Sequence, residues 1–377
     1  MTGRIEHGLG ATVVSVVATA AVLAGGRFDV PAPRTAAAVH AAVSMGANRA
    51  AHTATALSDG RVLVAGGFIE KGSAVGAELF DAASARFLPA APMLETRHSH
   101  TATHLPDGTV LVVGGYGSGS RTLAAAEIFD PRSNRFTPAG SLHSARADHT
   151  AVLLGNGQVL VAGGLGDGWT YLSSAELYDP AARTFTPVGS MTVPRESHTA
   201  VRLDRRRVLI VGGHQGPRRT LTLHASAEIY DATSGTFTRT GDMLVRRHKH
   251  DAVLLDDGRV LVTGGADERD SEGVYRSTEF FDPQAGTFSA GPPMQRPRYK
   301  HEGSVVALGD RRILIAGGAP DAEVFDPATG TFTVVAGAPQ FPGLFSAAAT
   351  LPGGRVLVTG GYGIGAGPVA SAWIYQP

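Results

Sequence analysis

The sequence contains no cysteine and is poor in charge and in lysine. The absence of cysteine excludes disulfides, thiolate metal sites, cysteine nucleophiles and lipoprotein anchors. Only 18% of the residues are charged, with 33 basic and 33 acidic side chains, so the chain has no electrostatic reason to bind nucleic acid or an acidic surface. The only lysines are Lys71, Lys249 and Lys300, and the positive charge is therefore almost wholly arginine.

Long hydrophobic runs are also scarce. One apolar segment of 14 residues, 11–24, follows Arg4; it is too short to span a bilayer comfortably but fits the core of a signal peptide. We therefore expect a signal peptide over residues 1–24, cut before Gly25, and a flexible Pro- and Ala-rich linker over residues 25–38. The protein would then be secreted or extracytoplasmic, without stable membrane insertion; if the leader is not cleaved, it stays in the cytoplasm.

Glycine and proline are abundant instead. The 49 glycines and 22 prolines together approach a fifth of the chain, while 43% of the residues are hydrophobic, which is enough to bury a large core. This combination indicates many tight turns rather than disorder. A length of 377 residues ordinarily suggests two domains, but repeat folds of this size form one.

Pairs of glycine recur along the chain at intervals of 48, 49, 49, 52, 53 and 43 residues. After six of the seven pairs comes a segment such as "AELYD" (175–179), whose aromatic residue is followed seven positions later by phenylalanine. A self-similar period of this size is typical of solenoids and propellers and has to be interpreted before any local motif. The seven pairs begin at Gly66, Gly114, Gly163, Gly212, Gly264, Gly317 and Gly360.

Each repeat is predicted to form four short strands. In the third repeat these are "HTAVLL" (149–154), "VLVAGG" (159–164), "AELYD" and "TFTPVG" (184–189), with turn residues between them. The second strand is apolar at successive positions, so both of its faces must be covered, as happens when four-stranded sheets stack around an axis. The paired glycines fit a place near that axis where backbones approach closely.

From residue 39 onwards these features resemble the kelch-repeat family of β-propellers. The match is a glycine pair followed by an aromatic residue, six further residues and a second aromatic, as in Gly163-Gly164, Tyr178 and Phe185. Kelch repeats usually carry tryptophan at the last position, where this chain has phenylalanine in all six copies. The resemblance implies an all-β fold, a seven-bladed kelch-type β-propeller over residues 39–377, similar to the central domain of galactose oxidase.

The seventh repeat ends with its third strand, "AWIYQ" (372–376), so the last blade lacks one strand. Residues 39–45, "VHAAVSM", have the length and end residues of "FTPVGSM" (185–191), and they stand before Arg49 as that segment stands before Arg195. We therefore expect an N-terminal strand to complete the last blade and close the ring, which leaves no open sheet edge.

The phrase Arg-x-x-His opens six of the seven blades. Six imidazoles near the channel would suit metal ligands or general bases, whereas the structural alternative is that each holds a loop of its own blade. In the seventh repeat Gly343 and Ser346 replace the arginine and histidine, and Trp373 replaces a glutamate that the other repeats carry; this joint loss favours a buried Arg/His/Glu cluster inside each blade. The arginines are also candidates for ligand binding, because in kelch domains this connection tends to line one mouth of the channel. They are Arg49, Arg97, Arg146, Arg195, Arg247 and Arg298.

The loops between each glycine pair and the third strand are the second candidate binding region, since function often resides in loops on a rigid scaffold. They carry aromatic side chains with flat faces for sugars or peptide side chains, although the same composition also suits solvated loops. Arg218 and Arg219 stand against the acidic "DERDSE" (267–272). The candidate ligand-binding residues of these loops are Tyr116, Trp169, Tyr171, Arg218, Arg219, Tyr275 and Tyr362.

No catalytic residue and no metal site is predicted, since no nucleophile with a base, no single carboxylate pair and no metal-ligand spacing stands out. Galactose oxidase depends on a tyrosine cross-linked to a cysteine, so its copper-radical chemistry is not expected in a chain without cysteine. We expect a monomeric, non-catalytic binding protein without cofactor, whose ligand at the channel mouth is a protein or a glycan and not nucleic acid. The alternative is a carbohydrate-acting enzyme of the sugar epimerase or mutarotase type at the same mouth, although residue types repeated six times suit scaffolding better than a unique site.

Overall fold

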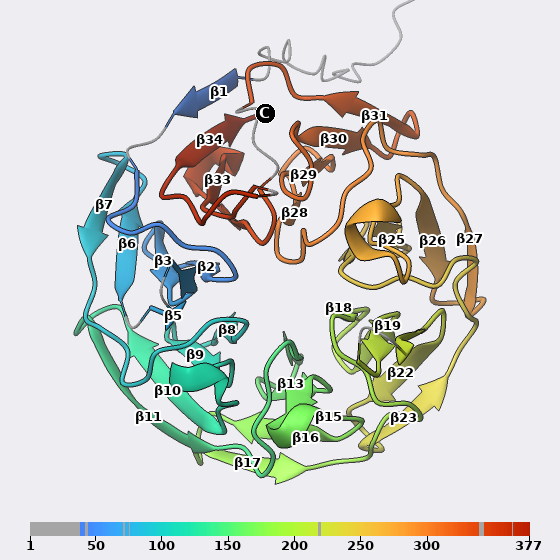
Figure 1. Cartoon of the computed structure of the whole chain (residues 1–377), viewed down its shortest axis with the longest axis horizontal. Helices are drawn as coiled ribbons and strands as arrows, with labels where there is room; N and C mark the ends of the chain where they lie inside the picture. The colour runs from blue at the N-terminus through green and yellow to red at the C-terminus, as the bar shows by residue number, and fades with distance from the viewer. Residues whose placement is uncertain are drawn as a thin grey trace, which may run out of the picture. The chain divides into compact units, whose positions relative to one another are not determined.

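The computed structural model describes residues 38–41, 44–70, 72–74, 76–217, 220–338, 343–363 and 365–377. Seven four-stranded antiparallel sheets are arranged as blades around a central channel (Figure 1). The predicted all-β, seven-bladed propeller is confirmed. The predicted signal peptide lies outside the described residues, and within them no helix is long and apolar enough to cross a membrane.

Blades 1 to 4 follow one another in chain order, each a meander of four strands. Blade 1 consists of β2 (Thr53–Ala56), β3 (Arg61–Ala65), β6 (Ala77–Asp81) and β7 (Arg86–Pro89). Blade 2 consists of β8 (Thr101–His104), β9 (Val110–Val113), β10 (Ala125–Asp130) and β11 (Arg135–Ser141). Blade 3 consists of β12 (Thr150–Leu153), β13 (Val159–Ala162), β16 (Ala175–Asp179) and β17 (Thr184–Pro187). Blade 4 consists of β18 (Thr199–Arg202), β19 (Arg207–Val211), β22 (Ala227–Asp231) and β23 (Thr236–Arg239).

The last three blades complete the ring, and the first strands of neighbouring blades contact one another all the way round. Blade 5 consists of β24 (Asp251–Leu254), β25 (Val260–Thr263), β26 (Thr278–Asp282) and β27 (Thr287–Ala290). Blade 6 consists of β28 (Val305–Ala307), β29 (Ile313–Ile315), β30 (Glu323–Asp326) and β31 (Thr331–Val334). Blade 7 consists of β32 (Ala347–Thr350), β33 (Val356–Thr359), β34 (Ala372–Gln376) and, at its outer edge, β1 (Ala38–Ala41).

The strand β1 closes the ring. It pairs antiparallel with β34, with Ala38 opposite Gln376, so the expected closure by an N-terminal strand is confirmed. Of the segment 39–45 that the sequence suggested, residues 42–43 lie outside the described residues. Met45 is nevertheless buried, as is its counterpart Met191 before blade 4, which supports the equivalence of the two segments.

The core lies between neighbouring blades. Successive side chains of a strand point to opposite faces of the sheet, and in blade 2 both faces are covered. Along β9, Leu111 and Val113 pack against blade 3, whereas Val110 and Val112 pack against blade 1. This is why the second strand of each repeat is apolar at every position.

The aromatic residues seven positions apart face each other across the outer hairpin of each blade. In blade 3, Tyr178 of β16 lies opposite Phe185 of β17, and their ring centroids are 4.8 Å apart. The turn between these strands sets the register, so the seven-residue spacing follows from the hairpin. Such tilted ring pairs add to the stability that burial provides.

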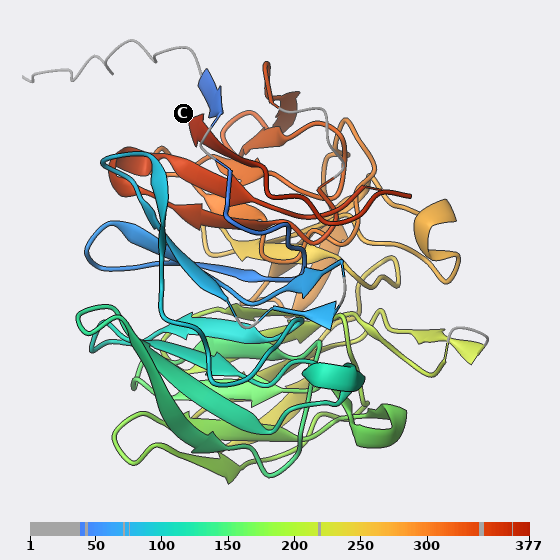
Figure 2. The same ribbon diagram turned by 60° about the vertical axis from the view of Figure 1, so that its left-hand side comes forward.

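The connections after the glycine pairs project from one side of the ring (Figure 2), which we call the channel mouth. The regular structure in the described parts of these connections consists of small hairpins and 3-10 turns. The hairpins are β4 (Phe68–Ile69) with β5 (Gly72–Ser73), β14 (Leu165–Gly166) with β15 (Thr170–Tyr171), and β20 (His214–Gln215) with β21 (Thr222–Leu223). The 3-10 turns are η1 (Ser118–Ser120), η2 (Asp167–Trp169) and η4 (Asp270–Glu272); η5 (Pro352–Gly354) lies in the turn between β32 and β33.

Candidate functional site

The six arginines of the Arg-x-x-His phrase lie inside the blades. In blade 4, Arg195 Nη1 donates to the carbonyl oxygen of Gly212 at 2.6 Å, and Nη2 donates to Glu228 Oε1 at 3.0 Å. Burial lowers the pKa of the Arg195 guanidinium, and the charge of Glu228 acts against this. The other five arginines make the same two contacts, and all six have exposed fractions of 0–1%.

This burial bears directly on the predicted binding residues. A guanidinium without exposed surface, already bonded to a carboxylate of its own blade, has no face for a ligand. The expected ligand-binding role at the mouth therefore does not fit these six side chains. They are Arg49, Arg97, Arg146, Arg195, Arg247 and Arg298.

The histidines of the phrase do not join the Arg–Glu pairs. His149 of blade 3 places Nε2 3.0 Å from Thr101 Oγ1 of blade 2, and its ring packs against Gly114 of the same blade. Burial and the charge of Arg146 lower the pKa of His149 to about 3, so its imidazole is neutral. The expected cluster is thus confirmed for arginine and glutamate, which pair inside one blade. It is wrong for histidine, because His149 contacts the preceding blade instead.

The glycine pair is a close contact between blades. Gly163 has φ +66°, and a Cβ there would lie 2.7 Å from the carbonyl oxygen of Arg195 in the next blade. The second glycine, Gly164, donates its N–H to that same oxygen at 2.8 Å. An equivalent bond closes the ring, from Gly361 to Arg49 at 2.9 Å, so the close backbone approach expected from the sequence is confirmed.

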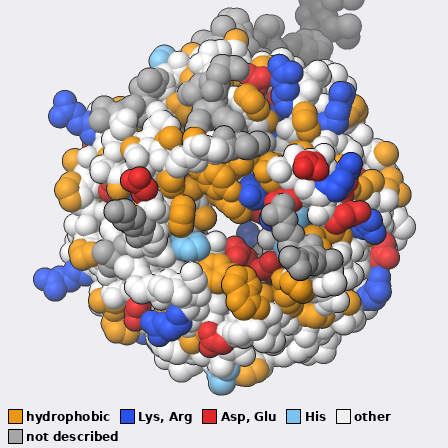
Figure 3. Space-filling model, viewed as in Figure 1, with side chains coloured by type: hydrophobic (Ala, Val, Ile, Leu, Met, Phe, Trp, Pro, Cys, Tyr) orange, Lys and Arg blue, Asp and Glu red, His pale blue; other side chains and the backbone are white. Residues whose placement is uncertain are grey.

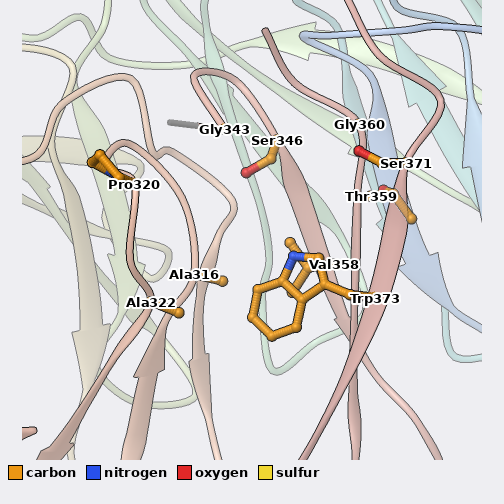
Figure 4. A pocket seen from close by; sticks show the side chains of 10 residues that line it. All are labelled: Ala316, Pro320, Ala322, Gly343, Ser346, Val358, Thr359, Gly360, Ser371 and Trp373. Carbon is orange, nitrogen blue, oxygen red and sulfur yellow. The ribbon is translucent and has the colours of Figure 1, made fainter. Parts of the chain in front are cut away.

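Blade 7 replaces the Arg–Glu pair by an indole. Figure 4 shows Trp373 of β34 lying near Val358, with Ser346 of the blade start above it. The cavity left there measures about 20 Å³, which is room for a water molecule but not for a ligand. The seventh blade is therefore filled by apolar volume where the other six bury two charges.

A pocket of about 540 Å³ opens at the channel mouth, a size typical of small-molecule sites. We call it the mouth pocket. Its lining comes from blades 3, 4 and 5, and two predicted aromatic residues belong to it: Trp169, which is 74% exposed, and Tyr171, whose hydroxyl donates to Gly216 O at 2.9 Å. Figure 3 shows this face of the ring hollowed at its centre, with acidic and histidine side chains beside the hollow. The remaining lining residues are Glu196, His214, Gly216, Pro217, Leu221, His248, Lys249, Glu268 and Asp270.

A chain of polar contacts runs along the floor of the mouth pocket. Glu196 Oε1 lies 2.8 Å from His214 Nε2, and Nδ1 of His214 lies 3.1 Å from Nδ1 of His248. Lys249 Nζ donates to Asp270 Oδ1 at 2.7 Å. The other ring nitrogen of His248 has no hydrogen-bond partner, and Asp270 Oδ1 is 3.8 Å from it. Burial lowers the pKa of His248 to about 3, which keeps the imidazole neutral.

The other predicted residues lie elsewhere. Tyr116 and Tyr362 stand half-buried at the channel mouth, where the hydroxyl of Tyr362 accepts a hydrogen bond from Lys300 Nζ at 2.8 Å. Tyr275 covers the buried Arg247, whose Cζ is 5.5 Å from the ring centroid. The predicted Arg218 and Arg219 lie outside the described residues.

The central channel holds a second cavity, of about 450 Å³, lined mainly by the starts of the innermost strands. Burial raises the pKa of Asp148 to about 7, with Glu196 adding to the effect, and it raises the pKa of Glu302 to about 8. Within the described residues no group of three His, Asp or Glu side chains is arranged to hold a metal ion.

One residue of each blade lines the channel entrance with a left-handed φ of 50–54°. These residues are Ala51, Ser99, Asp148, Ser197, Lys249, Lys300 and Phe345.

Comparison with known proteins assigns the family. Residues 99–318, more than half of the chain, match the family model of the KLHDC2/KLHL20/DRC7 Kelch-repeats domain. The chain belongs to the kelch-repeat family. This kelch chain matches no curated protein sequence.

Two solved structures are similar to this kelch propeller. One is a fungal alcohol oxidase of the AA5 family in complex with copper, with a TM-score of 0.70 and 18% identity over 91% of this chain and 77% of that chain. The other is YjhT, with a TM-score of 0.59 and 14% identity over 78% of this chain and 99% of that chain. At these identities the similarity shows the fold alone.

Sequence reasoning missed most of the polar side chains at the mouth of this kelch ring. Six of the eight occupy positions that vary between repeats: after the arginine, before the histidine or after the glycine pair; Glu302 follows a histidine, and Asp270 lies further along a loop. Aligning the seven repeats and comparing these positions would have singled out four residues of the mouth pocket, because the fourth repeat carries an acid and an imidazole there and the fifth an imidazole and an amine. The missed residues are Glu196, His214, His248, Lys249 and Asp270 in the pocket, and Asp148, Lys300 and Glu302 in the channel.

Proposed function

We propose that the protein binds a carbohydrate in the mouth pocket. The observation that carries the proposal is Trp169, an indole left 74% exposed at the rim of a concave pocket whose floor is polar. A sugar ring can lay its C–H face on an aromatic side chain while its hydroxyls reach carboxylates and imidazoles. The kelch propeller is a general interaction scaffold, and several residues that differ between its repeats line the mouth pocket.

The charges of the pocket favour a neutral ligand. Each carboxylate already has a partner: Glu196 contacts His214, Asp270 contacts Lys249, and Glu268 contacts Arg246 outside the pocket. A strongly charged ligand would have to disrupt these pairs, whereas hydroxyl groups can add to them. The concave shape also supports a small polar ligand over a flat protein surface.

A carbohydrate-acting enzyme of the epimerase or mutarotase type, using the same pocket, is the second candidate. The observation that favours it is the unpartnered Nε2 of His248, because proton transfer on a sugar requires a base within reach of a hydroxyl. NMR spectra of each sugar, recorded with and without the protein, would reveal turnover and would decide between the two candidates.

The experiment for the proposed function is a glycan array followed by isothermal titration calorimetry of the hits. Trp169→Ala should weaken binding about tenfold, the loss expected for one stacked ring. Phe68→Ala is the matched control, since Phe68 is an exposed aromatic in the equivalent hairpin of blade 1 and does not line the pocket. Equal affinities of the Trp169→Ala and wild-type proteins, or capture of a protein partner without any glycan hit, would refute the proposal.

We further propose that the protein is exported, on the basis of the apolar segment 11–24 that follows Arg4. Expression of the full chain with a C-terminal tag, followed by N-terminal sequencing, tests this. A mature N-terminus at or near Gly25 is expected, and an intact Met1 on protein retained in the cytoplasm would contradict export.

A further inference from the structure

The contacts of the two buried histidines determine where their protons lie. Glu196, as a carboxylate, can only accept, so Nε2 of His214 carries a proton and donates it. With one proton on each ring, Nδ1 of His214 then accepts from Nδ1 of His248. His248 therefore carries its single proton on Nδ1 and has an unprotonated Nε2.

Nothing in the described part of the chain satisfies that nitrogen. Nε2 of His248 has no hydrogen-bond partner, although the side chain is only 2% exposed and lines the mouth pocket. The nearby Asp270 accepts from Lys249 and has no proton to give. A buried acceptor left unpaired costs free energy, which a donor brought by a ligand would recover.

We propose that Nε2 of His248 accepts a hydrogen bond from one hydroxyl of the bound ligand, and that Glu196 and His214 are positioning residues that hold it as an acceptor. This inference rests on the proposed function and specifies the ligand further. The ligand is a neutral sugar that lies against Trp169 and has one hydroxyl that donates to this nitrogen. A deoxy sugar without that hydroxyl is rejected, because it leaves the nitrogen unpaired.

The first test needs no sugar. Nitrogen-15 NMR of the full chain, labelled at histidine, reports which ring nitrogen carries the proton. We expect the Nδ1–H form for His248 and the Nε2–H form for His214, assigned by the signals lost in His248→Phe and His214→Phe. A His248 protonated at Nε2 at neutral pH would overturn the inference.

The second test is calorimetry with methyl glycosides of galactose, glucose and mannose and with their monodeoxy analogues. For the sugar that binds, one deoxy analogue should bind the wild type at least tenfold more weakly, and His248→Phe should bind sugar and analogue equally. Glu196→Gln should weaken binding and place the proton of His248 on Nε2 in the NMR spectrum, because a glutamine amide can donate to His214 and reverse both rings. A merely structural role for Glu196 would lower the affinity without moving that proton. If no glycoside binds, the proposed function fails, whereas the proton positions are still decided by NMR.

Discussion

The substitution Glu228→Gln tests whether the repeated Arg–Glu pair is a structural device. Glu228 is fully buried; one carboxylate oxygen accepts from Arg195 Nη2 at 3.0 Å, and the other accepts from the backbone N–H of Thr192 at 2.8 Å. Glutamine fills the same space with one oxygen and one NH₂ group. Either Arg195 or Thr192 then faces a donor, and the charge of Arg195 loses its counter-ion.

The expected loss follows from that geometry. Removing one partner of a buried ion pair costs about 3–5 kcal/mol, and we expect about 3 kcal/mol because glutamine keeps one of the two contacts. An unfolding entropy of about 2.1 cal/mol/K per residue, taken over residues 38–377, amounts to about 0.7 kcal/mol/K. The melting temperature should therefore fall by about 4 °C.

Urea and thermal unfolding, followed by circular dichroism, measure this loss. The matched control is Asp242→Asn, which also turns a carboxylate into an amide but breaks a half-exposed pair with Arg239. Such pairs contribute less than about 1 kcal/mol. If Glu228→Gln lost no more stability than Asp242→Asn, the buried pair would not hold the blade together, and the reasoning would be wrong.

Three further outcomes are expected. Deleting residues 38–41 exposes the edge of β34 and should lower the melting temperature sharply; an unchanged melt would contradict ring closure. Gly163→Ala should destabilise more in urea than Gly168→Ala, because both glycines have φ near +65° but only the first would place its Cβ against the next blade; equal losses would argue against that contact. Burial raises the pKa of Glu302 to about 8, so the native state holds a proton that the unfolded chain has released, and stability falls as the pH rises from about 5 to 8. Thermal melts across that range should show the wild type losing stability relative to Glu302→Gln, and parallel curves would refute this.

The architecture could be predicted because the same sequence pattern recurs from repeat to repeat. The glycine pair recurs in all seven repeats and the aromatic pair in six, so a local ambiguity in one copy is resolved by the others. The Arg–Glu pair could be inferred from the seventh repeat, which lacks both residues. The contact of the histidine could not be inferred in this way, because each blade start in a ring also borders the preceding blade. Ser346, which replaces the histidine in the seventh repeat, lies against Gly317 of blade 6.

The mouth pocket was harder to predict for a physical reason. A residue that recurs between repeats has to satisfy the fold in each copy, and Arg195, whose counterparts occur in six repeats, is buried for that purpose. Glu196, its neighbour in sequence, is free to differ, and a backbone bridge places it beside His214. Trp169 and Tyr171 were found from the sequence because large aromatics in a loop are conspicuous. Which loops come together to form the pocket depends on loop conformations that the repeat pattern does not specify.

The pairing of Ala38 with Gln376 has a consequence for how the chain reaches its native state. Contacts so distant in sequence form late, because closing so long a loop costs entropy before any contact compensates for it. We expect the other blades to stack first and β1 to dock last, so that weakening β1 speeds unfolding and leaves refolding nearly unchanged. Until then the edge of β34 is open, and at high concentration the β1 strand of a second chain can fill it. Refolding yields should therefore fall with concentration as strand-exchanged oligomers form.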